Sequence, residues 1–160
     1  MAEQKTNVMR LLDQKKIKYT AREYPHTDAP VDGVTAAALM GQDPARVFKT
    51  LVARGASKKI YVFDIPAAAE LDLKKAAKAV GEKSIAMVHV SEITALTGYV
   101  RGGCSPVGMK KQYPTVFHET AAGLDTVIVS AGRIGFQVEL APADLIGLVR
   151  GAYADIITEE

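Results

Sequence analysis

The chain has 160 residues and a mass of 17.1 kDa, so we expect a single domain over 1–160 that is long enough to bury a core. A hydrophobic content of 48% with 24% charged residues excludes a disordered chain. The net charge of +2 permits nucleic-acid binding without requiring it. Cys104 is the only cysteine, which excludes an intramolecular disulfide. Lacking a long apolar segment and a signal-peptide core, the chain is predicted to be cytoplasmic and free of membrane association.

The N-terminal part is predicted to alternate between short helices and one strand. Thr6 is placed to cap a first helix, and a short strand follows over 19–24. Proline and glycine predict a loop over 26–33. An alanine-rich helix over 35–40, capped by Thr35, comes next.

The middle of the chain contains a predicted hairpin and a basic helix. Strands over 46–53 and 60–65 are separated by a short turn, which favours direct antiparallel pairing. Asp72 is placed to cap a helix over 73–80, and a strand is expected over 84–90.

The last third predicts a helix opened by Ser91, strands over 115–118, 126–130 and 136–140, and a helix that begins at Pro142. A turn over 131–135 should join the last two strands. Short helices among hairpin-like strands indicate a mixed α/β (α+β) domain with a largely antiparallel, barrel-like sheet surrounded by helices. The regular spacing and glycine fingerprint of a Rossmann fold are missing, so that fold is excluded.

Lys49 is the most informative single residue of the hairpin. Strand alternation places it between Val47 and Leu51 on one face and puts Thr50 on the other. A lysine between apolar neighbours is costly to bury unless it meets an anion. The alternative is an edge lysine whose ammonium reaches water.

The stretch 97–108 reads Thr-Gly-Tyr-Val-Arg-Gly-Gly-Cys-Ser-Pro-Val-Gly and is predicted to be a ligand-approaching loop. Gly102 and Gly103 can adopt positive φ and turn N–H groups toward a guest, while Pro106 stiffens the far side. Cys104 is either a nucleophile or a small apolar filler, and no histidine or acid is fixed beside it by the sequence.

Other catalytic constellations are weak. His26, His89 and His118 show no ligand spacing, so we expect no metal, and no cofactor motif is present. The scattered lysines could follow a phosphate backbone, but poor aromatic interleaving argues against base readout. Ser130 ends an apolar strand, a position where a hydroxyl usually serves as a hydrogen-bonding partner.

Three stretches in order, 47–52 (Val-Phe-Lys-Thr-Leu-Val), 97–108 and 129–133 (Val-Ser-Ala-Gly-Arg), together with the lysine-rich helix, resemble the YbaK/EbsC family. That family comprises bacterial Cys-tRNA(Pro) deacylases related to the editing domain of prolyl-tRNA synthetases. The resemblance covers nearly the whole chain and implies a free-standing editing enzyme. Its substrate would be a mischarged tRNA, and prolyl-tRNA synthetase would be a possible partner.

The resemblance also implies roles for particular residues. Catalytic roles fall to Lys49, Gly102 and Gly103, and the substrate-binding set is Tyr24, Thr50, Cys104, Ser105, Pro106 and Ser130. In the family the attacking group is thought to be the thiol of the substrate cysteine, which would explain why no protein nucleophile is evident. Positioning and an oxyanion site would then suffice.

The chain departs from the family pattern in two places. The turn after Ser130 usually reads Gly-Gly-Lys-Arg-Gly, whereas 131–135 here reads Ala-Gly-Arg-Ile-Gly, and the loop 28–34 matches poorly. The preferred amino acid is therefore open. A deacylase for another residue such as alanine, or a non-catalytic module that binds tRNA or a synthetase, are the competing hypotheses.

Overall fold

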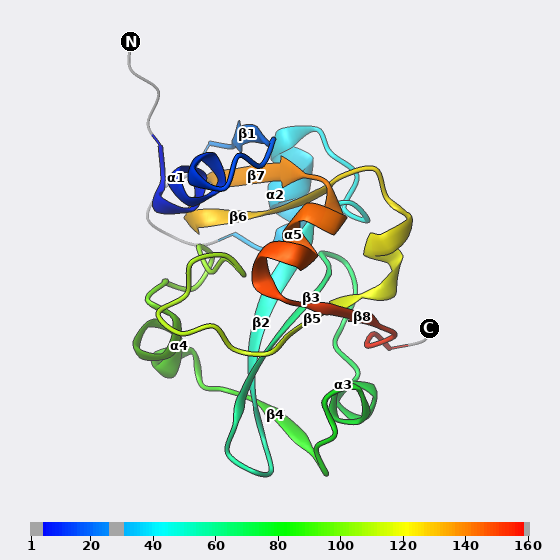
Figure 1. Ribbon diagram of the computed structural model, residues 1–160. Helices are drawn as coiled ribbons and strands as arrows, with labels where there is room; N and C mark the ends of the chain where they lie inside the picture. The colour runs from blue at the N-terminus through cyan, green and yellow to red at the C-terminus, as the bar shows by residue number, and fades with distance from the viewer. Residues whose placement is uncertain (1–4, 26–30, 159–160) are drawn as a thin grey trace.

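The computed structural model describes residues 5–25 and 31–158 as five short α-helices, a 3-10 helix and eight strands (Figure 1). The helices are α1 Asn7–Gln14, α2 Gly33–Met40, α3 Leu73–Val80, α4 Val90–Thr97, η1 Glu119–Gly123 and α5 Pro142–Val149. The strands are β1 Thr20–Glu23, β2 Phe48–Gly55, β3 Ile60–Pro66, β4 Ile85–Met87, β5 Thr115–His118, β6 Val127–Arg133, β7 Phe136–Leu140 and β8 Ala152–Ala154.

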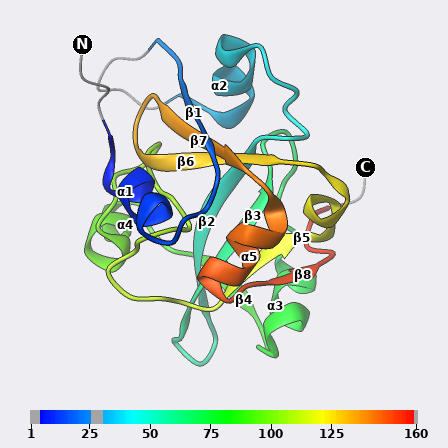
Figure 2. The same cartoon turned by 45° about the horizontal axis from the view of Figure 1, so that its top comes forward.

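The strands form two sheets. The smaller is antiparallel with the order β1-β7-β6, and the larger has the order β4-β2-β3-β5-β8. The β2–β3 hairpin is antiparallel, whereas β5 pairs in parallel with both β3 and β8. The predicted mixed α/β class is confirmed. The described strands form two sheets without closing into a barrel, and β8, which lacks a clear sequence signal, extends the larger sheet beyond β5 (Figures 1 and 2).

The two sheets are joined where the chain enters β2. Val47 forms an isolated parallel bridge with Ile128 of β6, and the Ile128 N–H donates to the Arg46 carbonyl at 2.9 Å. The Arg46 guanidinium donates to the carbonyl and hydroxyl oxygens of Thr126, both at 3.0 Å. These bonds fix the start of β2 against β6 and so tie the larger sheet to the smaller one.

Two apolar clusters hold the sheets and helices together. In the first, α1 packs through Val8 and Leu12 on the smaller sheet and α5, with the Phe48 and Phe117 rings 6.2 Å apart. In the second, α3 covers Phe63 of β3 on one side of the larger sheet. Burial of these side chains supplies the main driving force for folding.

Several sequence predictions are confirmed by local hydrogen bonds. Thr6 caps α1 by accepting the Met9 N–H, and Asp72 caps α3 by accepting the Lys75 N–H at 3.0 Å. The strands predicted over 115–118 and 136–140 have the predicted bounds, and the β2–β3 hairpin forms.

Two predicted helix starts are wrong because another residue provides the cap. Helix α2 begins at Gly33 rather than at Thr35, since the Asp32 carboxylate accepts the Thr35 N–H at 2.7 Å. Helix α4 begins at Val90 rather than at Ser91. The Glu92 side chain reaches back to accept the His89 N–H at 3.1 Å, so His89 is the capping residue and the helix starts directly after it.

Strand ends also differ from prediction. β4 is shorter than 84–90, and β6 continues through a bulge between Ser130 and Arg133, so the predicted turn over 131–135 is wrong in its first half. The bulge keeps the strand paired although Gly132 has a φ of +94°. The predicted loop over 26–33 lies outside the described residues from 26 to 30. Within the described residues, no helix is long and apolar enough to cross a membrane.

Candidate active site

A pocket of about 400 Å³ lies along β2, between the two sheets. Its walls come from α2, β2, the segment that leads into α4, the glycine loop and the ends of β6 and β7. The residues at its surface are Tyr24, Val31, Gly33, Ala36, Val47, Phe48, Lys49, Thr50, Leu51, Val52, Met87, Val88, Val90, Ile93, Arg101, Gly102, Cys104, Ser130 and Gln137. Six of the nine predicted site residues are therefore brought together.

The pocket exists because one edge of β2 is left open. β4 pairs with β2 only at Ala53, Arg54 and Gly55, so the edge beside Lys49 and Thr50 has no strand partner among the described residues. Alternation was expected to separate Lys49 from Thr50 on opposite faces of the strand. Both side chains nevertheless line the pocket, because the pocket runs along the open edge of β2, where residues on either face of the strand border it.

The Lys49 side chain is half-buried, and its ammonium makes no hydrogen bond or ion pair with the described residues. Burial lowers the pKa of its ammonium, and the more distant carboxylates of Glu70 and Asp32 partly oppose that shift. A desolvated cation without an ion-pair partner interacts strongly with an anion that enters the pocket. Its placement thus suits a group that meets developing negative charge or a phosphate.

The two adjacent glycines of the loop are needed for different reasons. Gly102 has a φ of +85° and lines the pocket. Gly103 lies so close to the Arg133–Ile134 backbone that a Cβ would meet it at 3.1–3.2 Å. Its N–H donates to the Val100 carbonyl at 3.0 Å, and its atoms do not reach the pocket surface. Gly103 thus holds the loop against the β6–β7 turn, while Gly102 faces the ligand space.

The rest of the loop forms a rigid support behind the pocket. The Tyr99 hydroxyl donates to the Val107 carbonyl, which closes the loop on itself. Ser105 is completely buried, and its hydroxyl accepts the Val107 N–H at 3.2 Å. Pro106 is buried as well. Neither Ser105 nor Pro106 lines the pocket, so both are placed to shape the loop rather than to touch a ligand.

Asp64 lies beneath the pocket floor and was not predicted. It faces Thr50 across the β2–β3 pair, with 2.5 Å between Thr50 Oγ1 and Asp64 Oδ1. The side chain is completely buried, and burial raises the pKa of its carboxyl to about 8, against the single opposing bond to Thr50. At neutral pH this carboxyl is therefore mostly protonated.

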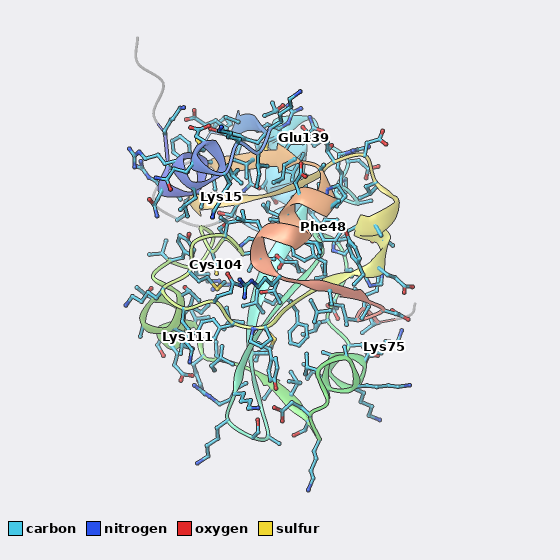
Figure 3. The ribbon with its side chains drawn as sticks, in the orientation of Figure 1. Lys15, Phe48, Lys75, Cys104, Lys111 and Glu139 are labelled. Atoms are coloured by element: carbon cyan, nitrogen blue, oxygen red, sulfur yellow. The ribbon has the colours of Figure 1, made fainter. Side chains whose placement is uncertain are left out.

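Cys104, on the glycine loop, lies near enough to Asp64 to be affected by its charge (Figure 3). Burial, with a smaller contribution from the Asp64 charge, raises the pKa of its thiol to about 12. Because the thiolate is the reactive form, Cys104 is not an activated nucleophile. It acts as a small apolar wall residue.

The smaller sheet contributes polar groups at the other side. Ser130 and Gln137 face each other across β6 and β7, and both line the pocket. The Ser130 hydroxyl accepts the Gly132 N–H at 3.1 Å, so its own proton is available to a ligand. Tyr24 is buried at the pocket wall, where its N–H donates to the Gly135 carbonyl at 3.0 Å.

Asp64 and Gln137 carry a sequence signal that could have been used. Each is a polar residue in an apolar strand, in the runs Tyr-Val-Phe-Asp-Ile and Phe-Gln-Val-Glu-Leu. A buried polar residue is more informative than an exposed apolar one. The apolar wall from Met87 to Ile93 has no such signal, because it depends on where β4 ends. Over residues 5–25 and 31–158, no group of three His, Cys, Asp or Glu is placed to hold a metal ion.

A mixed α/β domain with a pocket between two sheets defines the fold class, and comparisons with known proteins define the family. Residues 29–148 match the sequence profile of the aminoacyl-tRNA editing domain. The chain is 45% identical over 158 residues to a protein of Enterococcus faecalis, provisionally named Cys-tRNA(Pro)/Cys-tRNA(Cys) deacylase EbsC, with 99% of this chain and 96% of that protein covered. The chain belongs to the aminoacyl-tRNA editing domain family.

Two solved structures support the fold. One is described as a provisional trans-editing enzyme for prolyl-tRNA synthetase, with 26% identity, a TM-score of 0.81 and 95% of each chain covered. The other is a hypothetical protein with 22% identity and a TM-score of 0.84, over 94% of this chain and 99% of the other. The second likeness shows the fold alone.

Replacing Asp64 by Asn is expected to flatten the pH dependence of stability. Between the unfolded pKa near 3.8 and the folded value of about 8, the folded chain holds a proton that the unfolded chain has released. The wild-type free energy of unfolding therefore loses up to roughly 1.4 kcal/mol per pH unit in that window. Urea unfolding of the wild type and the variant at pH 5 and pH 8 gives the change in the free energy of unfolding between these pH values. An equal change in both proteins would contradict the prediction.

Alkylation of Cys104 is expected to be slow in the folded protein. A thiol with a pKa of about 12 is almost wholly protonated at pH 8, so iodoacetamide should react at least about 100-fold more slowly than in the urea-unfolded chain. Because Cys104 is the only cysteine, intact-mass spectrometry reports this site alone. Equal rates in the folded and unfolded chains would show an exposed or activated thiol.

Proposed function

We propose that the protein is an aminoacyl-tRNA deacylase that hydrolyses the ester of mischarged Cys-tRNA(Pro) in trans. The observation that carries the proposal is the half-buried Lys49 side chain, which lines the same pocket as Gly102 along the open edge of β2. Membership in the editing-domain family and 45% identity to a provisionally named deacylase support it. The pocket volume of about 400 Å³ suits an aminoacyl ester with its ribose rather than the tRNA body.

The site meets the needs of ester cleavage through a tetrahedral oxyanion. Such an intermediate is stabilised by donors and positive charge that are already in place before the reaction. Lys49 supplies the charge, either to the ester carbonyl or to the terminal phosphate, while Gly102 and Thr50 border the same space. The exposed Arg101 at the rim provides a second cation for the tRNA backbone.

The attacking atom is the sulfur of the substrate cysteine. It loses its proton and forms a bond with the ester carbonyl carbon, and the bond from that carbon to the 3′ oxygen of the adenosine breaks. The 3′ oxygen takes up a proton, and water then opens the cyclic thioester. A buried, protonated Cys104 leaves this role to the substrate, because it offers no thiolate of its own. The protein contributes positioning and electrostatic stabilisation.

Single-turnover assays with Cys-tRNA(Pro), Ala-tRNA(Pro) and Pro-tRNA(Pro), with and without prolyl-tRNA synthetase, test the substrate. We expect rapid release of cysteine and little release of alanine or proline, because only the cysteinyl ester carries a thiol. Equally fast cleavage of the alanyl ester would indicate an activated water. If no ester is cleaved under any condition, the protein is better explained as a tRNA- or synthetase-binding module.

Replacing Lys49 by Ala should lower the deacylation rate by at least about 100-fold, because a preorganised charge at the oxyanion is lost. tRNA retention on a filter should fall only a few-fold, since one cation among several phosphate contacts is removed. Replacing Lys78, an exposed lysine on α3 outside the pocket, is the matched control. A near-wild-type rate in the Lys49→Ala variant would refute the assigned role.

A further inference from the structure

The floor of the pocket contains a hydrogen-bonded pair of side chains, of which the one farther from the pocket is completely buried. Thr50 and Asp64 are direct partners in the β2–β3 register, and their side-chain oxygens lie 2.5 Å apart. Thr50 lines the pocket, and Asp64 is completely buried below it. Any ligand that contacts the Thr50 hydroxyl is therefore linked to Asp64 through one hydrogen bond.

Among the described residues, no cation or second hydrogen-bond donor lies against Asp64 to balance a negative charge. Its Oδ2 is buried and has no hydrogen-bond partner within the described chain. Its neighbours are the Thr50 hydroxyl on β2, the Cys104 thiol of the glycine loop, and Phe117, its register partner on β5. A charged carboxylate with one hydrogen bond is expensive in such surroundings, so the neutral acid is the favoured form.

A neutral acid changes what the Thr50 hydroxyl can do. When Asp64 carries the proton on Oδ1, it donates to Thr50 Oγ1, and the Thr50 hydrogen is free to point into the pocket. Oδ2 is then a carbonyl-type oxygen, whose lack of a partner is better tolerated than that of a buried donor. When Asp64 is ionised, the Thr50 hydrogen is committed to the carboxylate, and the hydroxyl can only accept.

We propose that Asp64 is a positioning residue that, as a neutral acid, turns the Thr50 hydroxyl hydrogen toward the carbonyl oxygen of the bound ester. This inference rests on the proposed deacylase function. Thr50 then adds an uncharged donor to the positive charge of Lys49 at the developing oxyanion. An ionised Asp64 would do the opposite, by withdrawing the donor and placing a second negative charge beneath the oxyanion.

Four variants and a control test this arrangement in single-turnover deacylation of Cys-tRNA(Pro). Thr50→Val should be about 100-fold slower, because one oxyanion donor is lost. Asp64→Val leaves Thr50 free to rotate and should be about tenfold slower in rate constant with little change in half-saturating enzyme concentration. Asp64→Asn, whose amide can donate to Thr50, should recover most of that loss. The double variant Thr50→Val/Asp64→Val should be no slower than Thr50→Val alone.

The matched control is Ser57→Ala. The Ser57 hydroxyl likewise donates to a carboxylate, that of Glu82, but neither residue lines the pocket. Its deacylation rate should equal that of the wild type. If Asp64→Val is as fast as the wild type, or if the Asp64 and Thr50 effects add independently, the positioning role is overturned.

The pH profile separates positioning from a purely structural role. The ratio of the Asp64→Asn rate to the wild-type rate should rise as pH increases from 7 to 9, because only the wild type loses the donor when Asp64 ionises. Taking the ratio cancels the ionisation of the substrate thiol and the alkaline lability of the ester. A ratio that stays constant over this range would count against the inference.

Carbon-13 NMR of protein labelled at the aspartate carboxyl carbons decides the protonation state without any deacylation assay. The resonance that disappears in Asp64→Asn should titrate near pH 8. If it titrates below pH 5, the inference fails even when the ester is cleaved. If the resonance titrates as expected but no ester is cleaved, the proposed function fails and the hydrogen-bond arrangement stands.

Discussion

The close approach of Gly103 to the Arg133–Ile134 backbone is the contact on which the site depends. It seats the glycine loop on the end of the smaller sheet, while the bridge between Val47 and Ile128 fixes β2 to the same sheet. The loop and the open edge of β2 are thereby held on opposite sides of one pocket. A Cβ at Gly103 would press on backbone rather than on a movable side chain, so the pocket walls would separate.

Desolvation shifts the pKa of Lys49, in the pocket, and that of Asp64, below it, in opposite directions. Burial lowers the pKa of Lys49 and raises that of Asp64, so both are moved toward their neutral forms. The carboxylates of Glu70 and Asp32 partly offset the shift at Lys49, whereas only the hydrogen bond to Thr50 opposes the shift at Asp64. Under the proposed function, the Lys49 charge and the Thr50 hydroxyl then meet the negative charge that develops on the ester carbonyl oxygen.

The sequence predicts local structure well where neighbouring residues alone determine it. The Asp72 cap and the alternating strand over 136–140 are examples. Prediction fails where a residue a few positions earlier caps the helix instead, as Asp32 does at α2. The site shows the same division. Motif residues on one strand, such as Lys49, are found from the sequence, but the partner across the hairpin requires the register, which is why Asp64 was missed.

The polar floor also bears on selectivity. An editing pocket has to reject the correctly charged prolyl ester, and a difference of one or two methylene groups in an apolar wall is worth only about 1–3 kcal/mol. The walls at Val90 and Ile93 can therefore supply only part of the discrimination. Buried polar groups discriminate more strongly, because an unsuitable ligand leaves them unpaired. Ser130 and Gln137 are buried polar groups of this kind, and Thr50 is half-buried beside Asp64. Under the proposed function, the direction in which each hydroxyl or amide donates contributes to the choice of ester.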